Sequence, residues 1–337
     1  MKRGHQPVRK PLGRLGAGII TLALLASMTA GSVPASFLQA SDRSVMTAER
    51  WARDLDVLAV ELPKQHKSLF FRVPEAEFLK AVGALKKDLP TLGQDEITVR
   101  LLQLVASVGD SHTAVGYRPQ RGLPLMLYWF KDGITVLNTT AEYKGLLYGR
   151  ITALAGRPIE EVTAALASVI PHENGAQVKN LVPNFLVDTA VLHGLKLIPS
   201  ADSASLTVVT GSGSSVTADM TPISFSSKPA WVADTAEQRD APLYLRKGNV
   251  FYWYEVLARD KALYFKYNSC REIADKPFAA FVKEMFAAAD AAAVDRVVVD
   301  LRHNGGGDSS IFGPFLEALK KRPALLQKGK LAVIVGR

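Results

Sequence analysis

Cysteine is nearly absent from the sequence, since Cys270 is the only one among its 337 residues. A single thiol excludes an intrachain disulfide, and it leaves no set of cysteines for a structural zinc cluster. No motif of metal ligands or of cofactor-binding residues takes their place. We therefore predict a fold that is held together without metal, cofactor or disulfide.

Acidic residues are absent before Asp42, so the first forty residues carry only positive charge. Basic residues precede an apolar run at positions 15–30, and small residues follow it; the basic residues are Lys2, Arg3, Arg9, Lys10 and Arg14. This order is typical of a secretory signal peptide. The run falls short of the ~20 residues of a membrane-spanning helix, and no cysteine lies near it for lipid attachment. We predict a signal peptide over residues 1–40 and an exported, extracytoplasmic protein, which would contact a membrane only through this segment if it stayed uncleaved.

The net charge of +9 falls to +4 once the five basic residues of that segment are set aside. A mild positive charge without a basic cluster does not indicate nucleic-acid binding. We therefore expect no nucleic acid among the partners.

Three segments between residues 51 and 108 share one apolar spacing, which places the apolar residues on one stripe of a helix. The stripes consist of Trp51, Leu55, Leu58 and Leu62, then Phe78, Val82, Leu85 and Leu89, then Ile97, Leu101, Leu104 and Val108. Pro63 and Pro90 are expected to end the first two helices, because proline interrupts helical hydrogen bonding. Gly109 suits the end of the third. We predict a helical domain over residues 45–116.

After Tyr117 the pattern changes to short strands with glycine between them. Strands are expected at residues 127–130, 134–137 and 150–154, and a hairpin at 206–219. Pro158 suits the first position of a helix that follows them. These features predict a β/α module over residues 117–225, followed by a linker over residues 226–244.

The last segment reads as alternating strands and helices. Residues 250–254 and 262–267 are expected to form a hairpin, and strands at 296–300 and 330–335 each follow a helical pattern. Connections of this kind give parallel strands, and ligands of such sheets bind beyond the carboxyl ends of the strands. The whole chain is therefore expected to be a multi-domain α+β protein whose C-terminal domain, residues 245–337, is of the α/β type.

The loop Asp300-Leu-Arg-His-Asn-Gly-Gly-Gly307 ends the strand at 296–300 and precedes an amphipathic segment. Adjacent glycines permit positive φ and can leave bare backbone N–H groups that bind an anion or an oxyanion. A tight turn without a ligand is the alternative. A phosphate site is less well supported, because the Gly-Lys-Ser/Thr of a P-loop does not follow. Asn304, Gly305, Gly306 and Gly307 are therefore candidates for an oxyanion or substrate site.

This loop resembles the Asp-Leu-Arg-x-Asn-x-Gly-Gly signature of the tail-specific, or C-terminal processing, serine peptidases. That superfamily also includes the tricorn core protease and the interphotoreceptor retinoid-binding repeats. A second stretch, Val108-Gly-Asp-Ser-His-Thr113, is similar to the family's Asp-Gly-His-Thr element. Residues 149–162 resemble its PDZ-like segment. The three matches occur in the family's order and together span roughly residues 45–337.

The resemblance implies a serine peptidase in which residues 117–225 form a PDZ-like module and residues 245–337 form a truncated catalytic domain. Members of the superfamily use either a lysine or a histidine as the base. His112, paired with Ser111, is the candidate base here, and the alternative is a loop that only caps a helix. Asp110, Asp300 and Arg302 are expected to order the two loops rather than to contact substrate.

The resemblance also places the nucleophilic serine after the strand at 330–335, at a position that the sequence given does not include. Ser309 and Ser310 lie on the wrong side of the glycines and lack a Gly-x-Ser-x-Gly pattern, so they are expected to cap the next helix. We expect the parent protein to be a peptidase and this chain by itself to be inactive.

An unfolded or exported polypeptide is the expected substrate, because a PDZ-like module binds an extended chain by strand addition. The alternative is a non-catalytic module that binds peptides or an apolar ligand on the same fold. The aromatic strand at residues 251–254 could line an apolar pocket, but such strands are more typical of a sheet core.

Overall fold

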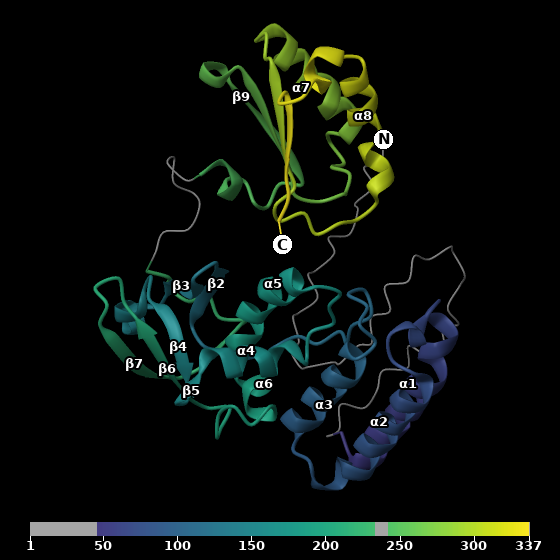
Figure 1. Cartoon of the computed structure of the whole chain (residues 1–337), viewed down its shortest axis with the longest axis vertical. Coiled ribbons are helices and arrows are strands. Elements are labelled where there is room, and N and C mark those ends of the chain that lie inside the picture. The colour runs from purple at the N-terminus through teal and green to yellow at the C-terminus, as the bar shows by residue number, and fades with distance from the viewer. Residues whose placement is uncertain (1–45, 233–241, 337) are drawn as a thin grey trace, which may run out of the picture. The chain divides into compact units, whose positions relative to one another are not determined.

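The computed structural model describes residues 46–232 and 242–336, which divide into two compact units. The first unit comprises the described residues up to Val232 and the second comprises those from 242 onward (Figure 1). The predicted signal peptide, residues 233–241 of the predicted linker, and Arg337 lie outside the described residues. Within the described part of the chain, no helix is both long and apolar enough to cross a bilayer.

Helices α1 (Ala48–Gln65), α2 (Glu75–Asp88) and α3 (Gln94–Ala106) open the first unit. Every residue of the three predicted stripes is buried, which confirms the helical prediction. Pro63 does not end α1, because it lies in the last turn and removes only its own N–H donor. His66 N still donates to Leu62 O at 2.9 Å. α2 does end next to Pro90, in a short 3₁₀ turn.

An antiparallel sheet forms the other half of this unit. Its order is β2 (Leu125–Phe130), β3 (Gly133–Thr139), β4 (Arg150–Leu154), β6 (Ala204–Val209) and β7 (Ser215–Met220), with β5 (Arg157–Pro158) paired to β4. A separate antiparallel pair joins β1 (Arg121–Gly122) to β8 (Ile223–Ser224). The strands and the hairpin predicted between residues 127 and 219 are therefore confirmed.

Three further helices belong to this unit, α4 (Ile159–Ala167), α5 (Gly175–Leu186) and α6 (Thr189–Gly194). The sequence predicts only α4, and Pro158 occupies its N-cap position rather than its first helical position. α6 packs closely on α3, since a Cβ added at Gly194 would lie 2.4 Å from Asp95 O. Val99 and Leu102 of α3 also belong to the core of the sheet. Helices and sheet thus share one compact unit, within which the separation into a helical domain and a PDZ-like module stays a prediction.

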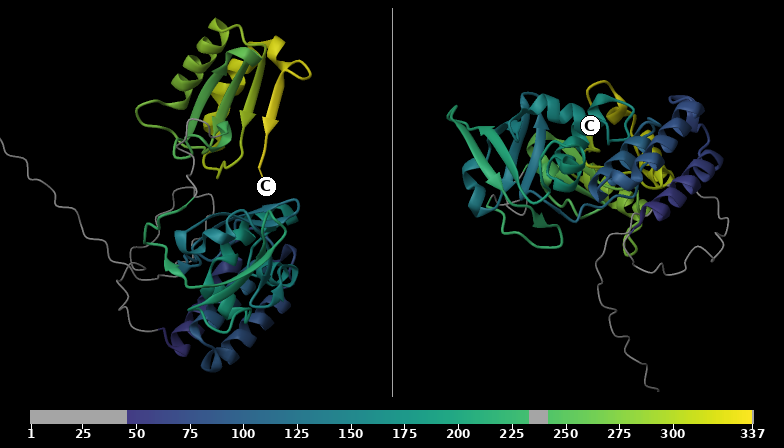
Figure 2. Two further views of the ribbon diagram at one scale, coloured as in Figure 1. Left: turned by 90° about the vertical axis from the view of Figure 1, so that its left-hand side faces the viewer. Right: turned by 90° about the horizontal axis from the view of Figure 1, so that it is seen from below.

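The second unit contains one sheet in the order β12 (Leu331–Ile334), β11 (Arg296–Asp300), β10 (Ala262–Tyr267) and β9 (Tyr252–Leu257). β9 and β10 are antiparallel, whereas β10, β11 and β12 are parallel. Helix α7 (Phe278–Ala291) connects β10 to β11, and α8 (Gly313–Lys320) connects β11 to β12 (Figure 2). The predicted hairpin and the predicted parallel neighbours are both confirmed.

Alternation along the strands separates the two faces of this sheet. Phe265 of β10 and Val299 of β11 lie in the apolar core together with residues of α7 and α8. Lys266 and Asp300 are the next residues along these two strands, so they point to the opposite face. Both side chains are nevertheless fully buried.

Candidate functional site

The histidine turn, residues 109–113, follows α3 and is held by its own aspartate. Gly109 has a φ of 72°, which reverses the chain after the helix. One oxygen of Asp110 accepts from the backbone N–H of His112 at 3.0 Å, and the other accepts from the Thr113 hydroxyl at 2.7 Å. The turn is therefore closed by local hydrogen bonds, as the sequence position of Asp110 leads us to expect.

A second histidine ties this turn to the end of α1. His66 Nδ1 accepts from the backbone N–H of Ser68 at 3.1 Å, so in the neutral ring the proton lies on Nε2, which donates to Asp110 at 3.0 Å. Burial alone would raise the pKa of Asp110, because it disfavours the charged carboxylate. Hydrogen bonds from His112, Thr113 and His66 outweigh that effect and lower the pKa of Asp110 to about 2.

Glu173 contacts the candidate general base His112 and its neighbour Ser111 through the Ser111 hydroxyl. The Ser111 hydroxyl donates to Glu173 Oε1 at 2.9 Å, and the Ser111 backbone N–H donates to the same oxygen at 3.3 Å. His112 Nδ1 lies 3.3 Å from Ser111 Oγ, and the His112 side chain is 84% exposed. No sequence pattern indicates Glu173, because it lies 62 residues away, between α4 and α5, and belongs to no motif.

The same residues are the ones that could hold a metal ion. Single ligand atoms of Asp110, His112 and Glu173 lie within 4.8 Å of one another. Imidazole and carboxylate groups together suit a divalent transition metal. Asp110 and Glu173 already accept hydrogen bonds inside the turn, so a metal would have to share their oxygens with these donors. The sequence predicts no metal, and the geometry alone does not require one.

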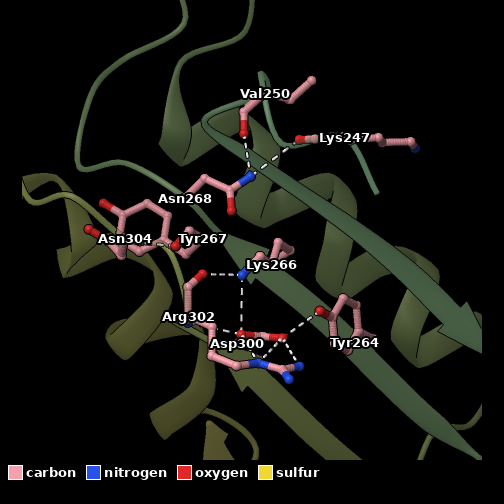
Figure 3. A network of polar contacts seen from close by, with 9 residues as sticks. All are labelled: Lys247, Val250, Tyr264, Lys266, Tyr267, Asn268, Asp300, Arg302 and Asn304. Carbon is pink, nitrogen blue, oxygen red and sulfur yellow. Dashed lines mark hydrogen bonds and ion pairs between the residues drawn. The ribbon is translucent and has the colours of Figure 1, made fainter. Parts of the chain in front are cut away.

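The glycine turn, residues 300–308, begins at a buried cluster of charges shown in Figure 3. Asp300 accepts from Lys266 Nζ at 3.2 Å, from Arg302 Nη2 at 2.6 Å and from the Tyr264 hydroxyl at 2.6 Å. Lys266 Nζ also donates to the backbone oxygen of Arg302. Asp300 and Arg302 thus make the charge-assisted contacts that an ordering role requires. Lys266 and Tyr264 are the two members that no sequence pattern indicates.

Burial and hydrogen bonding act in opposite directions in this cluster. Burial disfavours the charge of Asp300, but hydrogen bonds from Arg302, Tyr264 and Lys266 lower its pKa well below the ordinary value. Burial lowers the pKa of Lys266, and the bond to Asp300 partly offsets this. Burial and the neighbouring carboxylate both raise the pKa of Tyr264. The aspartate therefore stays ionised and fixes its three donors.

Side chains beyond the cluster fix the backbone of the glycine turn. Asn304 donates to Tyr267 O at 2.9 Å and accepts from the Gly306 N–H at 2.8 Å. The Cys270 N–H donates to Gly306 O at 2.9 Å, and the Asp308 N–H returns a bond of 2.9 Å to Cys270 O. These hydrogen bonds hold the glycine turn against the end of β10 and the segment that follows it.

These bonds change the prediction that all three glycines offer N–H groups. The Gly306 N–H is taken by Asn304, and the Gly305 N–H points to Asn268 O at 3.4 Å. Among the described residues, the Gly307 N–H has no hydrogen-bond acceptor. One donor is therefore available for an oxyanion, with a second at Gly305 only if its long bond breaks.

The start of the following helix also differs from the prediction. Ser309 and Ser310 do not cap it; they lie inside a 3₁₀ turn (Ser309–Phe312), and Asp308 caps that turn by accepting from the Ser310 N–H at 2.9 Å. A carboxylate at this position repels an anion, so the helix start does not supply the anion site. β12 ends beside the glycine turn, since a Cβ added at Gly336 would lie 3.6 Å from Arg302 Cα.

The structure therefore brings the predicted residues together in two sets, one in each unit. His112, Ser111 and Asp110 share the histidine turn with Glu173. The predicted residues from Asp300 to Gly307 share the glycine turn with Lys266.

Comparisons with known proteins support the fold and nothing finer. No protein-family model matches the chain, and no curated protein matches its sequence. The structure of mature CPAF complexed with lactacystin aligns over 80% of this chain and 59% of its own, at 14% identity and a TM-score of 0.57. Another structure of mature CPAF aligns over 78% and 56%, at 13% identity and a TM-score of 0.54. The chain thus has a multi-domain α+β, peptidase-like fold and spans less than two thirds of the CPAF chains that it matches.

Proposed function

We propose that this chain is part of a serine-type peptidase of the tail-specific type, which acts outside the cytoplasm on unfolded polypeptides. His112 is the general base of this proposal. The main support for this role is that the His112 imidazole is exposed, on a turn whose backbone Asp110 holds and beside the Ser111 hydroxyl. A base must reach its proton donor at hydrogen-bond distance, so a rigid backbone with an accessible ring suits this role.

The proposed reaction is acyl transfer through a serine. The base takes the proton of the serine hydroxyl while the serine oxygen bonds to the peptide carbonyl carbon. The carbonyl oxygen becomes an oxyanion, which backbone N–H donors stabilise in such reactions. The intermediate then expels the amine, which takes the proton from the base, and water releases the acyl group by the same steps in reverse.

We do not assign the nucleophile to any of the three serines near these turns. The Ser111 hydroxyl is already bonded to Glu173. Ser309 and Ser310 lie in the turn that Asp308 caps, on the C-terminal side of the glycines.

The sharpest test uses the full-length product of the gene and a fluorogenic unfolded polypeptide. We expect hydrolysis, and we expect His112→Ala to lower kcat/KM by ~10²–10⁴-fold, the usual contribution of a general base. His193→Ala is the matched control, since His193 bonds to Asp95 at the opposite end of α3 from the histidine turn. Equal activity of the His112→Ala protein would reject His112 as the base.

A non-catalytic peptide-binding function is the second candidate, and one feature of the first unit favours it. A cleft of about 610 Å³ runs beside β2 and α5, and its lining is mostly apolar. It includes Leu125, Leu127, Pro183, Val187 and Phe225. β2 is the outer strand of its sheet, so an extended peptide could pair with it while placing side chains in the cleft. Peptide binding by the full-length protein without any hydrolysis would favour this candidate over the peptidase.

A further inference from the structure

We infer that Glu173, acting through the Ser111 hydroxyl, is a positioning residue that holds His112 with its proton on Nδ1 and its Nε2 bare. This inference rests on the proposed role of His112 as the general base. It concerns a residue pair that no sequence motif indicates, because Glu173 reaches the turn from the segment before α5.

The Ser111 hydroxyl has a single proton to donate. Ser111 Oγ donates that proton to Glu173 Oε1 at 2.9 Å. Glu173 is exposed, and a glutamate in water is a carboxylate near neutral pH. A carboxylate has only acceptor atoms, which fixes the direction of the bond.

The ring of His112 lies next to this hydroxyl. With its proton committed to Glu173, Ser111 Oγ turns its lone pairs toward His112 Nδ1 at 3.3 Å. Two acceptors facing each other repel, so this contact is favourable only if Nδ1 carries the proton. The nearest Asp110 oxygen lies 3.7 Å from the same nitrogen and favours the same state by its charge.

The proton on Nδ1 determines which ring nitrogen can accept another proton. A neutral imidazole carries one proton, so a protonated Nδ1 leaves Nε2 as an acceptor. An exposed and unrestrained imidazole in water prefers the opposite tautomer, in which Nε2 carries the proton and only Nδ1, here facing Ser111 Oγ, could accept one. The series Glu173, Ser111 and His112 therefore supplies the ring in the state that proton abstraction requires.

The test is a long-range ¹H–¹⁵N correlation spectrum of the neutral His112 ring, recorded in EDTA so that the cluster holds no metal. We expect the shift of a protonated nitrogen at Nδ1 and that of a bare nitrogen at Nε2. Ser111→Ala and Glu173→Ala should both exchange these two shifts. Ser111→Thr keeps a hydroxyl and should retain the original pattern. Glu142→Ala removes an exposed glutamate of the same unit and should also retain it.

Each other outcome overturns the inference. A proton on Nε2 in the unmodified protein would show that the relay does not set the tautomer. Retention of the pattern in Ser111→Ala would do the same, and loss of it in Glu142→Ala would indicate a general effect of charge. The spectrum does not depend on catalysis, so its outcome is distinct from that of the hydrolysis assay. Absence of hydrolysis with the predicted shifts would reject the proposed function and leave the relay standing.

Discussion

The histidine turn and the glycine turn are both ordered by an aspartate, but the two aspartates lie in opposite environments. The side chain of Asp110 is 31% exposed and that of His112 is 84% exposed. Asp300 and Lys266 are both fully buried. Asp110 accepts mostly from neutral donors of its own turn, whereas Asp300 accepts from two cations and a tyrosine.

The two environments predict different behaviour of the two turns towards protons. Charges buried in a cluster cannot change protonation without a large free-energy cost, so the cluster around Asp300 can only fix backbone geometry. The exposed ring of His112 can exchange a proton with solvent or with a substrate. We therefore expect proton exchange at the histidine turn and a purely structural role for the cluster at the glycine turn.

Removal of the buried aspartate should have the largest effect. Asp300→Ala leaves Lys266 buried without its carboxylate, and breaking a buried ion pair costs about 3–5 kcal/mol in unfolding free energy. Asp110→Ala should cost less, because its partners can bond to water. Hydrogen exchange measured at increasing denaturant concentration, separately for residues 46–232 and 242–336, gives the unfolding free energy of both variants. Asp300→Asn is the milder control, and an equal cost for the two alanine variants would contradict the comparison.

The glycines of the two turns should respond differently to alanine. A Cβ at Gly307 would lie 2.3 Å from the backbone oxygen of Cys270, where φ is also +127°. A Cβ at Gly109 would meet the movable side chain of Arg72 at 2.6 Å. We expect Gly307→Ala to cost more than Gly109→Ala, within the ~1–3 kcal/mol typical of backbone strain. Gly305→Ala has open space around it and should cost least; the reverse order of unfolding free energies would show that the glycine turn is not rigid.

Acid should weaken the histidine turn before the glycine turn. The pKa of Asp110 is lowered to about 2 in the folded protein, so its contribution is complete above about pH 4 and is lost between about pH 4 and pH 2. After discounting for its partial exposure, we expect a loss on the order of 1 kcal/mol. Asp110→Asn should remove this part of the pH dependence in unfolding measurements of residues 46–232. The pKa of Asp300 lies further below its ordinary value, so the second unit should keep its contribution to lower pH.

The sequence predicts well what depends on local pattern. The stripes of the three helices, the hairpin and the parallel strands β11 and β12 follow from the spacing of apolar residues. The sequence does not predict the partners that meet through tertiary contacts. Lys266 reads as one polar residue of an aromatic strand, and only the register of β10 against β11 pairs it with Asp300.

The same limit explains the remaining errors. Glu173 meets Ser111 because the segment between α4 and α5 folds back onto the histidine turn. The number of free glycine N–H groups depends on where the Asn304 side chain points. A three-glycine motif indicates that donors can be present, but it does not indicate which of them the protein itself uses.

The smallest expected effect on stability concerns the outer strand of the second unit, where a change should alter association instead. β12 ends its sheet, its outer edge pairs with no described strand, and Val333 is 55% exposed in an uncharged stretch. Such edges pair with other molecules, and a lysine on the edge suppresses this. Val333→Lys should therefore reduce self-association in sedimentation velocity, while unfolding free energy changes by less than about 0.5 kcal/mol. Val57→Lys, at a residue of α1 that is 58% exposed, is the control for added charge away from any strand. Equal effects of the two lysines would attribute association to net charge rather than to the edge of β12.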